Sequence, residues 1–156
     1  MKVLFLCTAN SCRSILCEAL FNHLAPASLR AFSAGSQPKG FVHPLTLEAL
    51  ARAGVPGEGL TSKPSDTHAD LQPDLVITVC DKAAGEACPV FFGPAIKAHW
   101  GLADPSEVEG SDSEIAAAFD ATVARITARI QAFLASPLDQ LDAAALKAEL
   151  ARIASL

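Results

Sequence analysis

The chain has 156 residues, which is long enough for one domain with a substantial hydrophobic core. Half of the residues are hydrophobic, and the net charge of −5 at pH 7 gives no general attraction for nucleic acid or for an anionic membrane surface. The apolar run near the N-terminus is too short for a membrane span or an export signal. We therefore expect a cytoplasmic protein that binds neither nucleic acid nor membrane.

Strand and helix signals alternate along the chain. Strands are predicted at residues 2–7, 31–33, 74–79 and 96–100. Helices are predicted at residues 14–23, 45–53 and 114–135, the last capped by Ser111 or Ser113, and Pro137 is expected to open a final helix. This alternation predicts an α/β fold, a three-layer sandwich with about four parallel strands and helices on both faces.

Cys7 and Arg13 lie at the two ends of a short loop between the first predicted strand and the first predicted helix. Small residues let such a loop wrap around a tetrahedral oxyanion with its backbone N–H groups pointing inward, at the positive end of the next helix. Arg13 would add a bidentate grip, and the same field should stabilise a nucleophilic thiolate at Cys7. The residues expected to bind the anion are Thr8, Ala9, Asn10, Ser11, Cys12, Arg13 and Ser14. The alternative is an ordinary turn with a buried cysteine and a surface arginine.

The five cysteines are Cys7, Cys12, Cys17, Cys80 and Cys88. An odd number without an export signal argues against a secreted disulfide framework. Cys7 and Cys80 both end predicted strands, and ligands in an open α/β sheet bind beyond the carboxyl ends of the strands. We therefore expect both thiols at the same edge of the sheet. A phosphatase would need only Cys7 there.

Cys80 and Cys88 are separated by seven residues. A zinc half-site is one interpretation, but no matching Cys/His pair follows, so we expect no metal site. Two unconnected buried cysteines are a second interpretation. The third is a redox pair, which requires the intervening stretch to bend because a disulfide needs Cα atoms within about 7 Å.

Together these motifs resemble the arsenate reductases built on the low-molecular-weight tyrosine phosphatase fold, which are commonly coupled to thioredoxin. The resemblance is carried by residues 3–14, 33–36, 43–44, 76–80, 88–89 and 99–105. It covers a phosphatase-like arsenate reductase domain at residues 1–135, and residues 136–156 are expected to form a helical extension of the same domain.

The resemblance implies a reaction in which Cys7 attacks arsenate while Asp104 acts as the general acid. Cys80 would then attack Cys7, releasing arsenite, and Cys88 would move the disulfide to Cys80–Cys88. No bound cofactor is implied, because the electrons come from thioredoxin or another thiol donor, with glutaredoxin and glutathione as the alternative. Phosphate and sulfate are expected to compete with arsenate. On its own, an Asp-Pro pair such as Asp104-Pro105 is equally typical of a turn.

Some members of this family hold a potassium ion beside the loop, using counterparts of Asn10, Glu18, Ser33 and an aspartate. This sequence has Lys63 near the position where that aspartate is expected. An ammonium group there would replace the ion and pair with Glu18, so we expect activity without a potassium requirement.

A low-molecular-weight protein tyrosine phosphatase using Cys7, Arg13 and Asp104 is the alternative function. The chain contains no tyrosine, and Asp104-Pro105 leads into polar residues rather than the aromatic ones usual in such phosphatases. A catalytically idle thiol sensor is disfavoured, because the loop, the arginine and the acid are all present. The sequence leaves the oligomeric state and the choice of reductant open.

Overall fold

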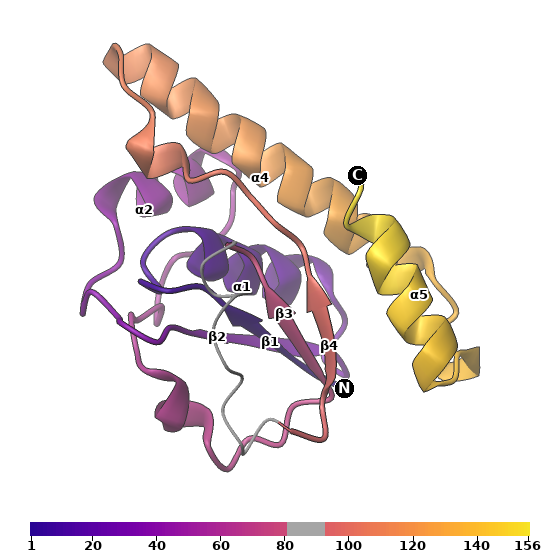
Figure 1. The fold of residues 1–156 in the computed structure, drawn as a ribbon. Helices are drawn as coiled ribbons and strands as arrows, with labels where there is room; N and C mark the ends of the chain where they lie inside the picture. The colour runs from indigo at the N-terminus through magenta and orange to yellow at the C-terminus, as the bar shows by residue number, and fades with distance from the viewer. Residues whose placement is uncertain (81–92) are drawn as a thin grey trace.

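The computed structural model describes residues 1–80 and 93–156, and its strands form a single parallel sheet (Figure 1). Within these residues the sheet has four strands in the order β2-β1-β3-β4. They are β1 (Lys2–Leu6), β2 (Arg30–Ala34), β3 (Leu75–Thr78) and β4 (Ile96–His99). These limits agree with the predicted strands to within one residue at each end, and the predicted α/β class is confirmed.

The register brings the carboxyl ends of the strands to one edge. Leu6 of β1 lies opposite both Ala34 of β2 and Thr78 of β3, and Thr78 lies opposite His99 of β4. The chain leaves β1 toward β2 on one side and adds β3 and β4 on the other. The strand order therefore reverses between β1 and β3, which is where open α/β sheets place their ligands.

Helices cover the two faces of the sheet unequally. The face of Val3, Phe5 and Ile77 meets, in the main core, the four α-helices found in residues 1–80 and 93–156. These helices are α1 (Arg13–Leu24), α2 (Pro44–Arg52), α4 (Asp112–Ala135) and α5 (Ala143–Ile153). The opposite face has a smaller cluster around Leu4 and Val76. There the 3-10 helix η1 (Ser65–His68) covers β2, with the His68 ring 5.6 Å from the ring of Phe32.

The start of the final helix differs from the prediction. Pro137 leads only into the short 3-10 helix η4 (Leu138–Gln140), and Leu141 is extended. α5 begins after Asp142, whose carboxylate accepts a hydrogen bond from the backbone N–H of Ala145 at 2.7 Å. The prediction was wrong because this carboxylate cap, rather than the proline, sets the first turn. Ser111, one of the two predicted caps of α4, accepts from the N–H of Glu114 at 3.2 Å.

α5 packs against the edge strand β4 (Figure 1). Its buried residues Leu146, Leu150 and Ile153 belong to the main core. The indole Nε1 of Trp100 donates to the carbonyl of Leu150 at 3.0 Å. None of the helices described here is long and apolar enough to cross a membrane.

Candidate active site

The point where the strand order reverses brings two cysteines together. Cys7 directly follows β1, and Cys80 lies just beyond the end of β3. Both thiols are buried, and a hydrogen bond links them. The hydroxyl of Thr8 also lies 3.6 Å from the Cys80 sulfur. The predicted juxtaposition of Cys7 and Cys80 at one rim is therefore present in the structure.

The loop from Cys7 to Ser14 turns its carbonyl groups outward. Neighbouring backbone N–H groups bond three of them at 2.9 to 3.0 Å: Gln37 donates to Thr8, Lys39 to Ala9 and His43 to Ser11. The backbone N–H groups of residues 9–12 donate no hydrogen bond to any other described residue. No side chain caps the start of α1, which begins at Arg13. N–H groups without a protein acceptor, next to the N-terminus of a helix, are donors of the kind that an oxyanion can use.

Asn10 and Gly35 fix the shape of this loop. Asn10 is fully buried with a φ of 44°, in a left-handed conformation that asparagine tolerates better than most residues. Its amide donates to the Ser14 hydroxyl at 2.8 Å and accepts from the Lys63 N–H at 2.9 Å. Gly35 packs directly behind the loop, where a Cβ atom would lie 2.4 Å from the Thr8 oxygen and 2.6 Å from the Cys7 oxygen. Only glycine permits this approach.

Arg13 connects the loop to the predicted general acid. One guanidinium nitrogen of Arg13 donates to the carbonyl of Leu102 at 3.0 Å, and the other lies 3.5 Å from the Asp104 carboxylate. The second carboxylate oxygen of Asp104 accepts from the N–H of Ser106 at 2.9 Å and from its hydroxyl at 2.6 Å. Asp104 thereby caps the 3-10 helix η3 (Pro105–Glu107) and turns one oxygen toward Arg13.

A small pocket is lined by some of the predicted loop residues, though not by Thr8, Asn10 or Ser14, and by three residues that sequence reasoning missed. These are Lys39, His43 and Ser106, and the pocket is also lined by Cys7, Ala9, Ser11, Cys12, Arg13 and Asp104. Lys39 adds a second positive charge beside Arg13. The only sequence signal for Lys39 was its place between Pro38 and Gly40, in a loop that precedes the α2 helix. Cys88 lies outside the described residues.

The protein-family comparison identifies this fold and site. Residues 2–150 match the family model described as low molecular weight phosphotyrosine protein phosphatase. The chain belongs to this family. The predicted resemblance to arsenate reductases of the same fold is also confirmed by individual relatives.

Three relatives illustrate that resemblance. The arsenate reductase of Halalkalibacterium halodurans is 34% identical over 131 residues, covering 84% of this chain and 93% of the relative. A solved arsenate reductase in the phosphate binding state superposes with a TM-score of 0.67 at 26% identity, covering 86% of this chain and 96% of the other. The thioredoxin-dependent arsenate reductase of Corynebacterium glutamicum gives a TM-score of 0.60 at 33% identity, covering 83% of this chain and 61% of the other.

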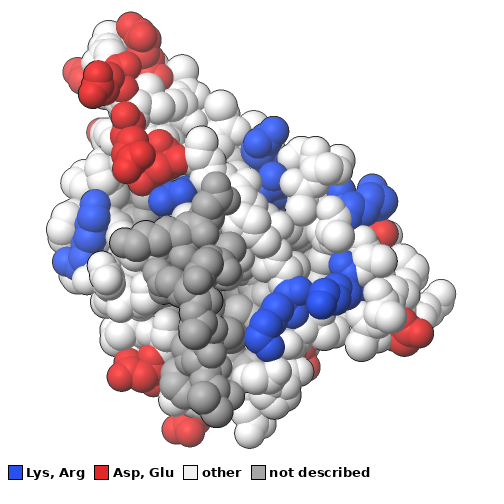
Figure 2. All heavy atoms as spheres, in the orientation of Figure 1, with Lys and Arg blue, Asp and Glu red and all other residues white. Residues whose placement is uncertain are grey.

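Charge is distributed unevenly around the site of this phosphatase-family chain. Figure 2 shows acidic side chains gathered where α4 begins. The exposed acidic residues in this part of the chain are Glu107, Glu109, Asp112 and Glu114. The positive field for an anion is therefore local, from the loop N–H groups, Arg13 and Lys39.

The Cys7 thiol is not acidified in this arrangement. Its hydrogen bond with Cys80 and its burial raise the pKa of Cys7, against the opposing effects of the Arg13 charge and the Thr8 N–H. The expectation of a resting thiolate at Cys7 is therefore wrong for this geometry, because the neighbouring thiol outweighs the cation. Burial also raises the pKa of Cys12, to about 11, and that of the fully buried Cys17.

The Lys63 side chain lies beside those of Glu18 and Ser33. Its ammonium lies 3.7 Å from the Glu18 carboxylate and donates to the Thr61 carbonyl at 2.6 Å. It also lies 3.5 Å from the Ser33 hydroxyl, which donates to Glu18. Burial lowers the pKa of Lys63, and Glu18 opposes that change. The predicted ion pair between Lys63 and Glu18 is thus present.

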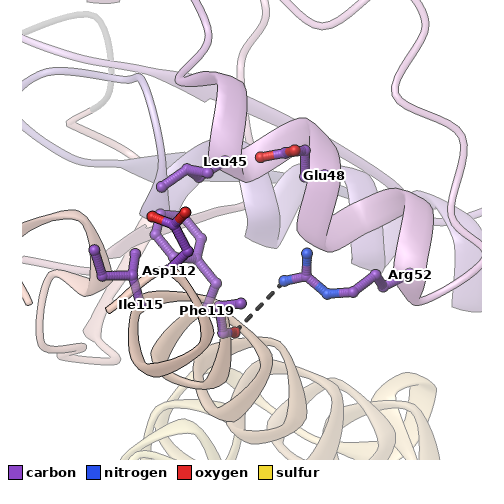
Figure 3. A pocket seen from close by; sticks show the side chains of 7 residues that line it. Leu45, Glu48, Arg52, Asp112, Ile115 and Phe119 are labelled. Atoms are coloured by element: carbon purple, nitrogen blue, oxygen red, sulfur yellow. Dashed lines mark hydrogen bonds between the residues drawn. The ribbon is translucent and has the colours of Figure 1, made fainter. Parts of the chain in front are cut away.

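A second pocket lies between α2 and α4 (Figure 3). Its volume is about 340 Å³, and Arg52 on its rim pairs with Asp120 at 2.9 Å. The Phe119 ring in this pocket is 5.9 Å from the ring of His43, which lines the first pocket. Neither pocket contains a metal site, since no group of His, Cys, Asp and Glu among the described residues is arranged to hold an ion.

Proposed function

We propose that this chain reduces arsenate to arsenite, with Cys7 as the nucleophile and Cys80 as the thiol that resolves its adduct. The contact between Cys80 and Cys7, which lines one pocket with Arg13 and Asp104, carries the proposal. Hydrolysis of a phosphate ester requires no second thiol at the nucleophile, whereas reduction of an oxyanion requires two thiols to supply two electrons.

In the first step the loop N–H groups and Arg13 hold the tetrahedral anion, and Lys39 adds to the positive field. The Cys7 sulfur attacks arsenic, and an oxygen of the bound anion accepts the thiol proton. Asp104 supplies a second proton, so that one oxygen leaves as water. The Ser106 bonds to one Asp104 oxygen leave the other oxygen facing the pocket, which suits this role.

In the second step Cys80 attacks the Cys7 sulfur, and its thiol proton passes to an oxygen on arsenic. A Cys7–Cys80 disulfide forms, the sulfur–arsenic bond breaks, and its electron pair stays with arsenic, which leaves as arsenite. The two thiols have then lost two electrons and arsenic has gained two. Cys88 would next attack Cys80 and free Cys7.

A dithiol protein would reduce the final Cys80–Cys88 disulfide. The thioredoxin-dependent relative from Corynebacterium glutamicum supports thioredoxin as that donor. The chemistry also requires a compartment where thioredoxin and the free thiols stay reduced, which favours the cytoplasm.

The tyrosine phosphatase alternative uses the same loop but fits the pocket less well. The pocket contains no Phe, Tyr or Trp among its described lining residues, so an aryl group would have only the imidazole ring of His43 to stack on. Weak hydrolysis of an artificial aryl phosphate is expected as a by-product of the shared loop.

Arsenate-dependent NADPH oxidation with thioredoxin and thioredoxin reductase tests the proposal. Turnover should be lost in Cys7→Ser, Cys80→Ser and Cys88→Ser. It should persist in Cys17→Ala, a control thiol that is buried outside the pocket. A wild type that cleaves aryl phosphates but reduces no arsenate with any donor would establish the phosphatase instead. Full turnover of Cys88→Ser, or turnover only with glutathione and glutaredoxin, would overturn the recycling steps.

A further inference from the structure

Arg129 is a buried arginine that touches neither pocket. It lies on α4 with only 3% of its surface exposed. Burial lowers the pKa of Arg129, which reflects the cost of removing its charge from water. No carboxylate side chain pairs with it in the described part of the chain. Burying a guanidinium is costly unless its N–H groups are hydrogen-bonded. The three acceptors of Arg129 therefore indicate its role.

Those partners are main-chain oxygens from two separate segments. Arg129 donates to Ala154 at 3.0 Å and to Leu156 at 3.3 Å, both beyond the end of α5. It also donates to the carbonyl of Gly101 at 3.1 Å, just after β4. The guanidinium therefore joins the C-terminal segment to the chain that leaves the sheet toward the active site.

The Gly101 carbonyl is next to a second carbonyl that the active site uses. Leu102 accepts from Arg13 at 3.0 Å through its oxygen and donates to the Val79 carbonyl at 2.9 Å through its N–H. Asp104 follows two residues later. Two arginines from different helices thus bind consecutive carbonyls. Arg129 binds Gly101 from the core, and Arg13 binds Leu102 from the pocket.

We infer that Arg129 is a positioning residue, which fixes the Gly101 carbonyl so that Leu102 orients Arg13 toward the oxyanion. The C-terminal segment contributes by holding the guanidinium in place through Ala154 and Leu156. This inference deepens the proposed function but rests on it only for the identity of the substrate. The effect on oxyanion binding follows from the geometry whether or not arsenate is reduced.

The test is the affinity of the reduced protein for inorganic phosphate, measured by calorimetry in variants of Arg129. Arg129→Leu should weaken phosphate binding by about 2- to 30-fold, the range typical of substitutions that act through a packed network. Arg129→Lys keeps a charged donor and should recover most of the affinity. If Arg129→Leu does not fold, Arg129→Gln replaces it in the same comparison.

Arg30→Leu is the matched control. Arg30 is another arginine whose guanidinium donates to main-chain carbonyls, here those of Asn22, Ala25 and Pro26. It lies at the amino end of β2, whereas the pocket lies at the carboxyl ends of the strands. Its replacement should lower the melting temperature without changing the phosphate affinity. Unchanged phosphate binding in a folded Arg129→Leu or Arg129→Gln, or equal weakening in Arg30→Leu, would overturn the inference. A wild type that reduces no arsenate, with phosphate binding that still depends on Arg129, would reject only the proposed function.

Discussion

The two sides of the active site are held in different ways. The Cys7 loop is bonded along its length to residues that follow β2, and its Asn10 is fully buried. The chain that leads to Asp104 is held at Leu102 by Arg13 and at Gly101 by Arg129, and the Asp104 side chain is 20% exposed. The anion loop is therefore shaped before any anion arrives. The position of the acid, by contrast, depends on side chains from distant helices.

The largest expected effect comes from removing the acid itself. Asp104→Asn keeps the cap on Ser106 but supplies no proton, so kcat for arsenate should fall by about 10²- to 10⁴-fold. Phosphate affinity should change little, because Arg13 and the loop remain. A kcat within a few-fold of wild type would remove Asp104 from the mechanism.

Gly35→Ala perturbs the Cys7 loop, the other of the two sides compared. Its Cβ would lie 2.4 Å from the Thr8 oxygen, so the loop must shift, and we expect about 1–3 kcal/mol of destabilisation together with loss of phosphate binding. Chemical denaturation and calorimetry measure both. The control is Gly57→Ala, whose Cβ would meet only the flexible end of Leu47. Equal phosphate affinity in the two variants would contradict the preorganised loop.

Lys63→Ala tests whether the Lys63 ammonium takes the place of a potassium ion beside the Cys7 loop. Without the ammonium, Glu18 and Ser33 keep the acceptors that a cation needs, so potassium should activate the variant several-fold over sodium at equal ionic strength. The wild type should respond equally to both ions. Several-fold activation of the wild type by potassium would reject the replacement of the ion by Lys63.

The smallest effect is expected on the reactivity of Cys7. Because the hydrogen bond with Cys80 is the largest cause that raises the pKa of Cys7, Cys80→Ala should lower that pKa. More thiolate is then present at a given alkaline pH, so iodoacetamide should label Cys7 faster. Mass spectrometry of the Cys7 peptide across pH measures this, with Cys17→Ala as the unchanged control. If the pKa of Cys7 stays the same or rises in Cys80→Ala, the Cys80 thiol is not what raises it in the wild type.

Much of this arrangement could be predicted because it follows from local patterns. The buried runs before Cys7 and Cys80 predicted two strands, and the parallel sheet then required both thiols at one edge. The left-handed conformation of Asn10 and the close approach of Gly35 to the loop, by contrast, were not predicted.

What the sequence did not reveal depends on tertiary contacts. The three acceptors of Arg129 are main-chain oxygens, which carry no residue-type signal. A lowered pKa of Cys7 was predicted from the field of the loop N–H groups, the helix N-terminus and Arg13, whereas the neighbouring thiol and burial raise it. The final helix was predicted to begin at Pro137 because the apolar spacing continues through Leu141. In the structure Leu141 is extended and Asp142 caps the helix.

The most direct test of the central claim is a single turnover of the Cys88→Ser variant with arsenate and no reductant. The proposal predicts one arsenite released per chain and one disulfide, which peptide mapping should place between Cys7 and Cys80. Cys17 should remain a free thiol. No arsenite, or a disulfide that excludes Cys80, would contradict the claim that these two thiols supply the electrons.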